Sequence, residues 1–268
     1  MNILILGDVM GPTGRRAIEQ NLLKLIKTKN IDFTVLNGEN AADDGKGITK
    51  DIAESFFKFG VDVITSGNHI WDKNEIIDFI SKEKRLLRPE NIAKGSPGRG
   101  HGIFLCKNKR FKIAVINLMG NVFMRKTEDA FLAAKELQKK IKLKESSDFI
   151  VVDFHGEITS EKMAIGHFFD GKATAVVGTH THVPTADSRI LNSGTAFQTD
   201  IGMCGDYNSV IGMNKENSIM KFFKKKDAKN HFPADGVSTL SGLIIEADEE
   251  TGLAKKVERY INGGVLNN

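Results

Sequence analysis

The sequence begins with MNILILGDVMGPTG (residues 1–14), and this stretch indicates the class of fold. Residues 2–6 form a short apolar run that stops abruptly at Gly7 and Asp8, as expected of a buried strand that ends in a loop. Apolar residues then recur at helical spacing and predict an amphipathic helix over residues 16–29. The stretch therefore predicts a strand, a loop and a helix, in that order.

The same order of elements continues along the first part of the chain. Residues 33–36 predict a second strand, residues 52–59 a second helix, and residues 61–65 a third strand. Strands that alternate with helices form parallel βαβ units, in which functional groups gather beyond the carboxyl ends of the strands. We therefore expect an α/β fold with its site at those ends.

The later part of the chain adds a hairpin and several buried strands. Residues 102–106 and 112–118, separated by the polar residues 107–110, predict the hairpin. The other predicted elements are a helix over residues 130–141 and strands over residues 149–154, 173–177, 240–246 and 255–262. Because no repeat or low-complexity linker divides the sequence, we expect one domain over residues 1–268.

The composition is that of an ordinary globular protein, with 40% hydrophobic and 27% charged residues. No apolar run approaches the roughly 20 residues of a membrane-spanning helix, and the N-terminus lacks the basic region of a secretory signal. Cys106 and Cys204 do not have CxxC spacing and are expected to be reduced thiols. These features predict a cytoplasmic protein without membrane contact.

The formal charge of +4 makes the surface mildly cationic. This charge permits an anionic substrate, but it is too small to indicate binding to duplex nucleic acid. The most basic stretch lies at residues 221–229, and we interpret it as a solvated helix end rather than a nucleic-acid contact.

Side chains that can bind metals are concentrated in five short segments, each at the end of a predicted strand. The segments are GDVMG with Asp8, NGEN with Glu39 and Asn40, GNH with Asn68 and His69, DFHGE with His155, and GTHTH with His180 and His182. Oxygen ligands combined with imidazoles suit Mn, Fe or Zn better than Ca, which prefers oxygen ligands alone. The number of ligands is sufficient for two ions.

Each segment taken alone is a weak signal, because single histidines and Gly-Asp pairs at strand ends are common for structural reasons. His101, His167 and His231 are interpreted in that way, as surface or hydrogen-bonded residues. The HxH pair of His180 and His182 is a stronger signal, since alternate residues at the end of a strand can point to the same side. The prediction of a metal site therefore rests on the five segments together.

The charges of such a site indicate its chemistry. Glu39 is the candidate bridging ligand, because a carboxylate between two cations offsets their repulsion, and Asp8 would then bind one ion only. Two divalent ions with two carboxylates leave a charge of about +2, which favours an anionic substrate and a metal-activated hydroxide as nucleophile. His69 follows Asn68 and is the candidate general acid for the leaving oxygen. Asp72 could orient His69, although an exposed turn aspartate is the simpler interpretation.

The motifs GD, GEN, GNH, HGE and GTHTHV, in this order, resemble those of the calcineurin-like metallophosphoesterases. More closely, they resemble the bacterial YmdB family, whose members act as phosphodiesterases on 2′,3′-cyclic nucleotides and related phosphoesters. The resemblance extends from Gly7 to the segment TDIGMCG at residues 199–205. It implies a phosphodiesterase of cyclic nucleotides such as 2′,3′-cAMP, a four-layer α/β sandwich with two central mixed β-sheets, and a homo-oligomeric state.

The resemblance also implies two divalent transition-metal ions, Fe or Mn, with Zn as an alternative. The first ion would be held by Asp8, Glu39, Asn40 and His182, and the second by Glu39, Asn68, His155 and His180, with His69 as the proton donor. Two positions differ from most of the superfamily, because Met10 replaces a histidine and Glu39 replaces the usual bridging aspartate. Both differences match the YmdB branch, and they leave the identity of the metals open.

Other functions share some of these features. Amidohydrolases on a (β/α)8 barrel also place histidines and a carboxylate at strand ends, but they typically begin with HxH, which comes last here. The spacing GxxxGxxG of Gly7, Gly11 and Gly14 matches neither a dinucleotide fingerprint nor a P-loop. The remaining alternative is a metal-binding regulatory protein that acts mainly by contacting RNA or a protein partner.

Overall fold

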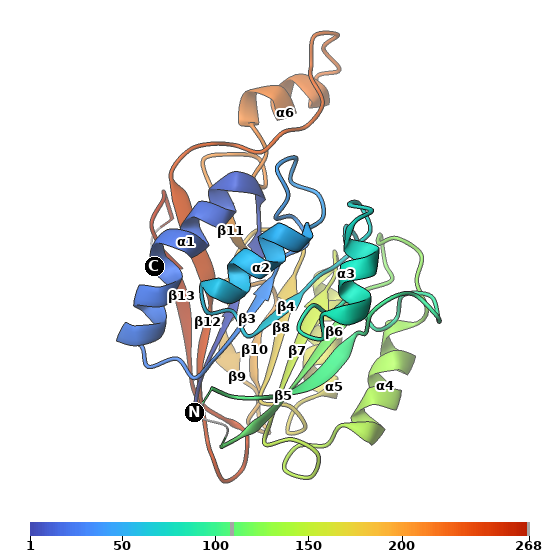
Figure 1. Ribbon diagram of the computed structural model, residues 1–268, viewed down its shortest axis with the longest axis vertical. Helices are drawn as coiled ribbons and strands as arrows, with labels where there is room; N and C mark the ends of the chain where they lie inside the picture. Colours follow the sequence, from blue (N-terminus) through green and yellow to red (C-terminus); the bar gives the residue numbers. More distant parts are fainter. Residues whose placement is uncertain (108–109, 267–268) are drawn as a thin grey trace.

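Two β-sheets pack face to face, and helices cover the outer face of each sheet (Figure 1). The computed structural model describes residues 1–107 and 110–266. Asn108 and Lys109, which belong to the predicted hairpin turn, lie outside the described residues. The layers follow the order helix, sheet, sheet, helix, so the predicted four-layer fold class is confirmed.

The first sheet is mixed. Its strand order is β2 (Asp8–Val9), β11 (Met203–Asp206), β12 (Ser238–Ala247), β1 (Asn2–Leu6), β3 (Phe33–Asn37) and β4 (Val63–Thr65), and β13 (Ala254–Asn262) pairs with β12. Strands β1, β3 and β4 are parallel neighbours, as the βαβ pattern predicts. Strand β12 lies antiparallel on the other side of β1, so a late segment of the chain completes the sheet around the first strand.

The second sheet is also mixed. Its strand order is β5 (His101–Leu105), β6 (Lys112–Met119), β7 (Phe149–His155), β8 (Ala175–Thr179), β10 (Ala196–Gln198) and β9 (Arg189–Ile190). Strands β5 and β6 pair antiparallel, which confirms the hairpin pairing, whereas β6, β7 and β8 are parallel. Among residues 1–107 and 110–266, neither sheet closes on itself, and this arrangement excludes the (β/α)8 barrel of the amidohydrolases.

The alternation of side chains along the strands explains why the sheets pack together. In β1, Ile3 and Ile5 belong to the core between the sheets, whereas Leu4 and Leu6 belong to the core under the helices. Val115 of β6 contributes to the same inter-sheet core. Because successive side chains point to opposite faces, a strand that is apolar throughout has to be covered on both sides.

Helices provide the two outer layers. The first sheet is covered by α1 (Gly11–Thr28), α2 (Lys50–Lys58) and α3 (Ile76–Lys82), and the second by α4 (Ala130–Lys140) and α5 (Thr159–Phe168). Helix α6 (Lys215–Phe222) covers neither sheet and extends away from the body of the protein (Figure 1). Among the described residues, no helix has the length and apolarity that are needed to cross a membrane.

Some boundaries differ from those predicted. The first helix begins at Gly11 rather than at residue 16, because Pro12 stands in its first turn, where the missing proline N–H leaves no hydrogen bond unmade. The strand predicted over residues 173–177 is shifted to Ala175–Thr179. The sequence did not predict α3 or α5, since these short helices bury too few apolar side chains to show a helical period. The basic stretch interpreted as a helix end begins in the last turn of α6, which ends at Phe222.

The inter-sheet core should dominate the stability of the protein. Phe149 of β7 is fully buried there and makes an edge-to-face contact with Phe111 at a centroid distance of 5.5 Å. We expect Phe149→Ala to lower the free energy of unfolding by about 3–5 kcal/mol in chemical denaturation. Phe223→Ala, at a position that is 73% exposed, serves as the control and should change it by less than about 0.5 kcal/mol. Equal losses in the two variants would contradict this account of the core.

Candidate metal centre

The parallel strands of both sheets bring the predicted site residues together. Asp8 begins β2, Glu39 and Asn40 follow β3, Asn68 and His69 follow β4, His155 is the last residue of β7, and His180 and His182 follow β8. These positions lie at or just beyond the carboxyl ends of parallel strands, and Asp8 lies just beyond the end of β1. The site is therefore formed where the strand ends of one sheet meet those of the other.

The imidazole of His155 lies at the centre of this group. Its Nε2 lies 2.9 Å from Oε1 of Glu39, 3.1 Å from Oδ1 of Asn68 and 3.1 Å from Nδ1 of His180. Glu39, His155 and His180 each offer one ligand atom, and these atoms lie within 4.8 Å of one another. The spacing is that of ligands arranged around a common cation.

Each of the three histidines engages its outer ring nitrogen in a hydrogen bond. The pairs are His155 Nδ1 with Thr179 Oγ1 at 2.9 Å, His182 Nδ1 with the backbone oxygen of Ile211 at 2.8 Å, and His180 Nε2 with Glu157 Oε2 at 3.0 Å. These partners assign the ring proton to the outer nitrogen and leave the lone pair of the inner nitrogen directed at the site. Histidines that bind metals are held in the same way.

The second half of the group contains Asn40 and His182. Nε2 of His182 lies 3.2 Å from Oδ1 of Asn40, whose amide nitrogen donates to the backbone oxygen of Gly45 at 2.9 Å. With the His182 ring proton on its other nitrogen, two acceptors face each other here. Two acceptors cannot form a hydrogen bond with each other, but both can bind the same cation.

The carboxylate of Asp8 is buried and only partly satisfied. Its Oδ2 accepts a hydrogen bond from the backbone N–H of His180 at 3.0 Å. Its Oδ1 has no hydrogen-bond partner among the described residues and lies 3.6 Å from Nδ1 of His155. A buried carboxylate oxygen without a donor is costly unless a positive charge approaches it, so this atom also fits a metal.

Burial and mutual charge perturb the pKa values of the central groups. Burial raises the pKa of Asp8 to about 6, although His155 and His182 oppose the shift. For Glu39, burial is the largest cause and acts in the raising direction, but His155 and His69 together outweigh it through charge and hydrogen bonds and lower the pKa to about 2. Burial acts to lower the pKa of His155, but Glu39, Asp8 and Asp153 together overcome it and raise that pKa to about 9. Burial and the charge of His155 lower the pKa of His180 to about 3. The carboxylates thus favour positive charge at this position, which a proton or a metal ion can supply.

A buried carboxylate directly beneath the site connects both sheets. Asp153 of β7 accepts hydrogen bonds from Asn37 of β3 at 3.0 Å, Thr65 of β4 at 2.5 Å and Thr179 of β8 at 2.7 Å. Thr179 in turn accepts from Nδ1 of His155, so Asp153 helps to orient that ring. Burial raises the pKa of Asp153 against the effect of these donors.

The turn that carries His180 and His182 is strained and tightly held. The φ angles of His180 and His182 are 100° and 65°, in a region that residues with side chains rarely adopt. The predicted HxH geometry of alternate residues on a strand is therefore wrong, since both residues lie in the turn after β8. Asp200 holds this turn by accepting from N and Oγ1 of Thr181 at 3.1 and 2.7 Å. Lys162 of α5 pairs with Asp200 at 2.6 Å, and both side chains are buried.

His69 lies beside the group and contacts it through Glu39. Its backbone N–H donates to Oε2 of Glu39 at 3.1 Å, and its Nδ1 lies 2.7 Å from Oδ2 of Asp72. Asp72 also accepts from Arg125 at 3.3 Å. The simpler interpretation of Asp72 as an exposed turn residue is wrong, because its carboxylate orients the His69 ring.

Sequence reasoning assigned no role to several residues that shape the site. They are Asn37, Asp153, Glu157, Lys162, Thr179, Asp200 and Arg125. Glu157 and Asp200 lie within the quoted motifs HGE and TDIGMCG and could have been found there. Asn37, Asp153 and Thr179 likewise lie within the quoted motifs NGEN, DFHGE and GTHTH. Lys162 and Arg125 lie outside all of the motifs, and their partners Asp200 and Asp72 are distant in the sequence. His101 is a hydrogen-bonded residue as interpreted, with Nδ1 3.1 Å from Glu90.

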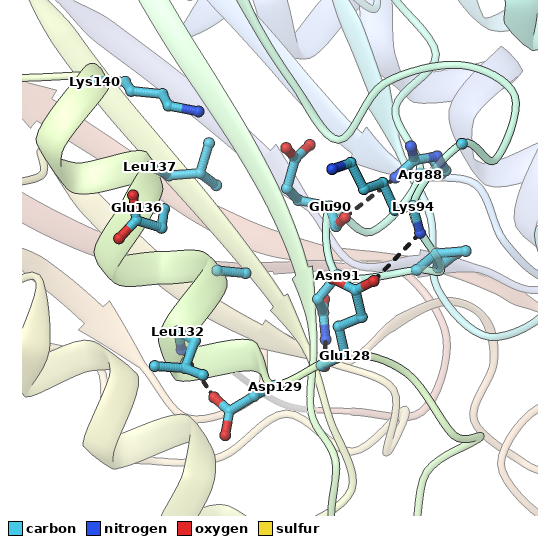
Figure 2. Close-up of a pocket in the computed structure, with 13 residues that line it drawn as sticks. Arg88, Glu90, Asn91, Lys94, Glu128, Asp129, Leu132, Glu136, Leu137 and Lys140 are labelled. Carbon is cyan, nitrogen blue, oxygen red and sulfur yellow. Dashed lines mark hydrogen bonds between the residues drawn. The ribbon is translucent and has the colours of Figure 1, made fainter.

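A separate cavity lies between α4 and the segment of residues 88–95 (Figure 2). Its volume is about 490 Å³, and none of the predicted site residues lines it. The guanidinium of Arg88 donates to the backbone oxygens of Pro89 at 2.8 Å and Pro97 at 3.0 Å. The hydrogen bonds of Arg88 therefore stabilise the surrounding loop. Because none of the predicted site residues lines the cavity, it is not the candidate active site.

The family model of the YmdB-like proteins matches residues 4–260. The chain belongs to this family. A relative in Bacillus subtilis (strain 168), named 2′,3′-cyclic-nucleotide 2′-phosphodiesterase, is 46% identical over 261 residues, which are 97% of each chain. Membership of the YmdB-like family implies divalent metal ions, and the cluster of Glu39, His155 and His180 offers a place for one.

Solved structures agree with this family assignment. A hypothetical protein from Thermus thermophilus is 34% identical, with a TM-score of 0.89 over 99% of this chain and 100% of that one. A structure described as a novel phosphatase, from Mycoplasma pneumoniae, is 36% identical, with a TM-score of 0.89 over 98% of this chain and 93% of that one. The fold is that of the calcineurin-like phosphoesterases.

The close approach of the two sheets at the site requires a glycine at position 67. A Cβ atom at Gly67 would overlap the ring of His155 and the carboxylate of Glu39. We expect Gly67→Ala to displace both side chains and to weaken metal binding by about tenfold or more. Titration calorimetry with Mn²⁺ measures the loss, and unfolding of the metal-free variant shows whether the fold is kept. Unchanged affinity would contradict the proposed crowding.

The buried pair of Lys162 and Asp200 should contribute strongly to stability. Lys162→Met leaves a buried carboxylate without its cation, which costs about 3–5 kcal/mol of unfolding free energy in comparable cases. We expect the lower end of this range, because Thr181 and Gly202 still donate to Asp200. Urea denaturation measures the change, and Lys135→Met on the exposed face of α4 serves as the control. A loss no larger than that of the control would show that the pair is dispensable.

Proposed function

We propose that this protein is a phosphodiesterase that uses two divalent metal ions to hydrolyse 2′,3′-cyclic nucleotides such as 2′,3′-cAMP. The observation that carries the proposal is that three imidazoles each turn one ring nitrogen to the site while a hydrogen bond holds the outer nitrogen. These inner nitrogens converge with carboxylate and amide oxygens, a donor set that suits transition metals. The relative named a 2′,3′-cyclic-nucleotide 2′-phosphodiesterase supports the substrate class.

The proposed ligands form two overlapping sets. One set contains Asp8, Glu39, Asn40 and His182, and the other contains Glu39, Asn68, His155 and His180. Support for the first set comes from the facing acceptors of Asn40 and His182 and from the unpaired oxygen of Asp8. Support for the second set comes from the distances around Nε2 of His155. Glu39 is shared because its Oε1 faces the cluster and its Oε2 is held by the N–H of His69.

The chemistry divides between the ions and the protein. When bound, the ions would lower the pKa of a water molecule and stabilise negative charge on the phosphoryl oxygens. Mn and Fe are the proposed metals, since a mixed set of oxygen and imidazole ligands suits both, and Zn is the alternative. The strained turn at His180 and His182 keeps two ligands in place, so the site needs little rearrangement during the reaction.

His69 is the proposed general acid. Its Nδ1 is held by Asp72, which leaves Nε2 as the nitrogen that can donate a proton. The hydrogen bond to Asp72 also fixes the orientation of the ring. Opening the cyclic phosphodiester at its 2′ oxygen would transfer this proton to the leaving oxygen and yield a 3′ phosphate.

Variants at neighbouring positions separate catalysis from metal binding. We expect purified protein with Mn²⁺ to hydrolyse 2′,3′-cAMP, and His69→Ala to lower kcat by about 10²–10⁴-fold while the metal content stays unchanged. Asn68→Ala should instead lower the metal content together with the activity. Product analysis and metal analysis of the same samples provide the measurements. Full turnover by His69→Ala would contradict its role, and no turnover by the metal-loaded wild type would contradict the proposed function.

The alternative of a metal-binding regulatory protein without relevant catalysis is not favoured, because the relatives are named for phosphodiesterase and phosphatase activity. The His69→Ala variant also tests this alternative in cells. If a cellular phenotype survived the loss of hydrolysis, binding rather than catalysis would be the main role.

A further inference from the structure

The segment of residues 215–232, here called the arm, extends from the body of the protein and contains α6 (Figure 1). Its tip exposes large apolar side chains, and Phe222 and Phe223 are 81% and 73% exposed. Ile219 and Phe232 are also exposed. Isolated exposed apolar residues are common on soluble proteins, but several on one projecting element indicate an interaction surface.

The arm also concentrates the positive charge of the protein. Residues 215–231 contain six lysines and two acidic residues, so this short segment has a formal charge of +4, equal to that of the whole chain. Lys224, Lys225 and Lys226 are exposed, and they form no ion pair with any carboxylate of the described residues. The exposure of these lysines agrees with a solvated helix end. However, the segment alone accounts for the net positive charge of the whole chain, which distinguishes it from the rest of the surface.

Hydrogen bonds within the arm hold it in a defined conformation. The side chain of Asn217 is buried, and its amide nitrogen donates to the backbone oxygens of Lys229 and Asn230 at 3.2 Å each. Its Oδ1 accepts from the N–H of Lys229 at 2.8 Å. These bonds fold the segment after α6 back onto the helix, so the exposed rings and lysines are presented together.

The residues that flank the arm lie next to the metal centre. Pro233 packs against Gly45, whose backbone oxygen accepts from the side chain of Asn40 at 2.9 Å. Ile211, just before the arm, accepts from the ring of His182. A polymer bound along the arm would therefore be led towards two of the proposed metal ligands.

The combination of exposed rings and unpaired lysines decides between kinds of partner. A second copy of this chain would need an acidic face to match the lysines, and the remainder of the chain is neutral overall. A single-stranded nucleic acid offers phosphates for the lysines and unstacked bases for the phenylalanines, which is how such strands are commonly bound. Only RNA has the 2′ hydroxyl that a 2′,3′-cyclic phosphate requires, so the proposed chemistry favours RNA over DNA.

We propose that the arm binds single-stranded RNA and guides strands that end in a 2′,3′-cyclic phosphate to the metal centre. The guiding step rests on the proposed function, whereas binding by the arm does not depend on it. The bases stack on Phe222 and Phe223, and the lysines that follow contact the phosphates.

The test is fluorescence anisotropy with a labelled, unstructured RNA of about 12 nucleotides that ends in a 3′ phosphate, added to the Mn²⁺-loaded protein. We expect Phe222→Ala with Phe223→Ala to weaken binding by about tenfold or more, through lost stacking. Replacing Lys224, Lys225 and Lys226 by alanine should reduce the slope of log affinity against log salt by about 2 between about 50 and 200 mM salt.

A matched triple variant on α4, Lys135→Ala with Lys139→Ala and Lys140→Ala, removes the same charge from a distant surface. It should leave both affinity and slope unchanged, and an equal loss in this variant would overturn the proposal in favour of non-specific attraction. Duplex RNA of the same length should bind more weakly, because its bases are not free to stack, and equal binding would likewise overturn it.

The remaining outcomes separate this proposal from the proposed function. If 2′,3′-cAMP is hydrolysed but the RNA does not bind at about 50 mM salt, the arm proposal fails and the phosphodiesterase stands. If the RNA binds through the arm but no cyclic nucleotide is hydrolysed, RNA binding by the arm stands, whereas the phosphodiesterase and the guiding step fail. Two other results would overturn the arm proposal: binding of the arm to anionic phospholipid vesicles without RNA binding, or dissociation of an oligomer by the phenylalanine variant with unchanged RNA affinity.

Discussion

The hydrogen-bonded carboxylate of Asp153 is the constraint on which the rest of the site depends. It lies between the two sheets and accepts hydrogen bonds from residues of β3, β4 and β8. Because Asp153 itself belongs to β7, this one carboxylate fixes the ends of four strands relative to one another. Burying a carboxylate is costly unless donors surround it, and three donors from different strands meet that need only in the correct register. The metal centre lies directly above this point.

Fixed strand ends allow ligands from distant parts of the chain to approach within hydrogen-bonding distance. Glu39 from one sheet and His155 from the other lie 2.9 Å apart, and Gly67 leaves the space that this contact needs. The arrangement includes features that are energetically unfavourable in the folded protein, among them the buried carboxyl group of Asp8 and the left-handed backbone at His180. Such strain persists only where the surroundings hold it, and the buried pair of Lys162 and Asp200 does so here.

Much of the fold could be predicted from periodicity alone. The apolar strands and the helices between them identified the parallel parts of both sheets, because burial on two faces leaves a clear signal in the sequence. Helix α5 escaped prediction because its buried face carries Lys162 and Gly166 instead of a regular apolar stripe. The turn after β8 was assigned the geometry of a strand, since nothing local reveals that Asp200 holds it in another conformation.

The sequence by itself determined which side chains can bind metals and in which order they occur, because ligand chemistry is a property of residue type and the strand ends are marked by glycine and polar residues. It therefore supplied Asp8, Glu39, the asparagines and the histidines of the candidate centre. Only the tertiary structure decided which ring nitrogen faces inward, which carboxylate joins the sheets, and that the residues flanking the basic arm lie next to the site. Those features depend on contacts between residues far apart in the chain, and such contacts leave no local pattern to read.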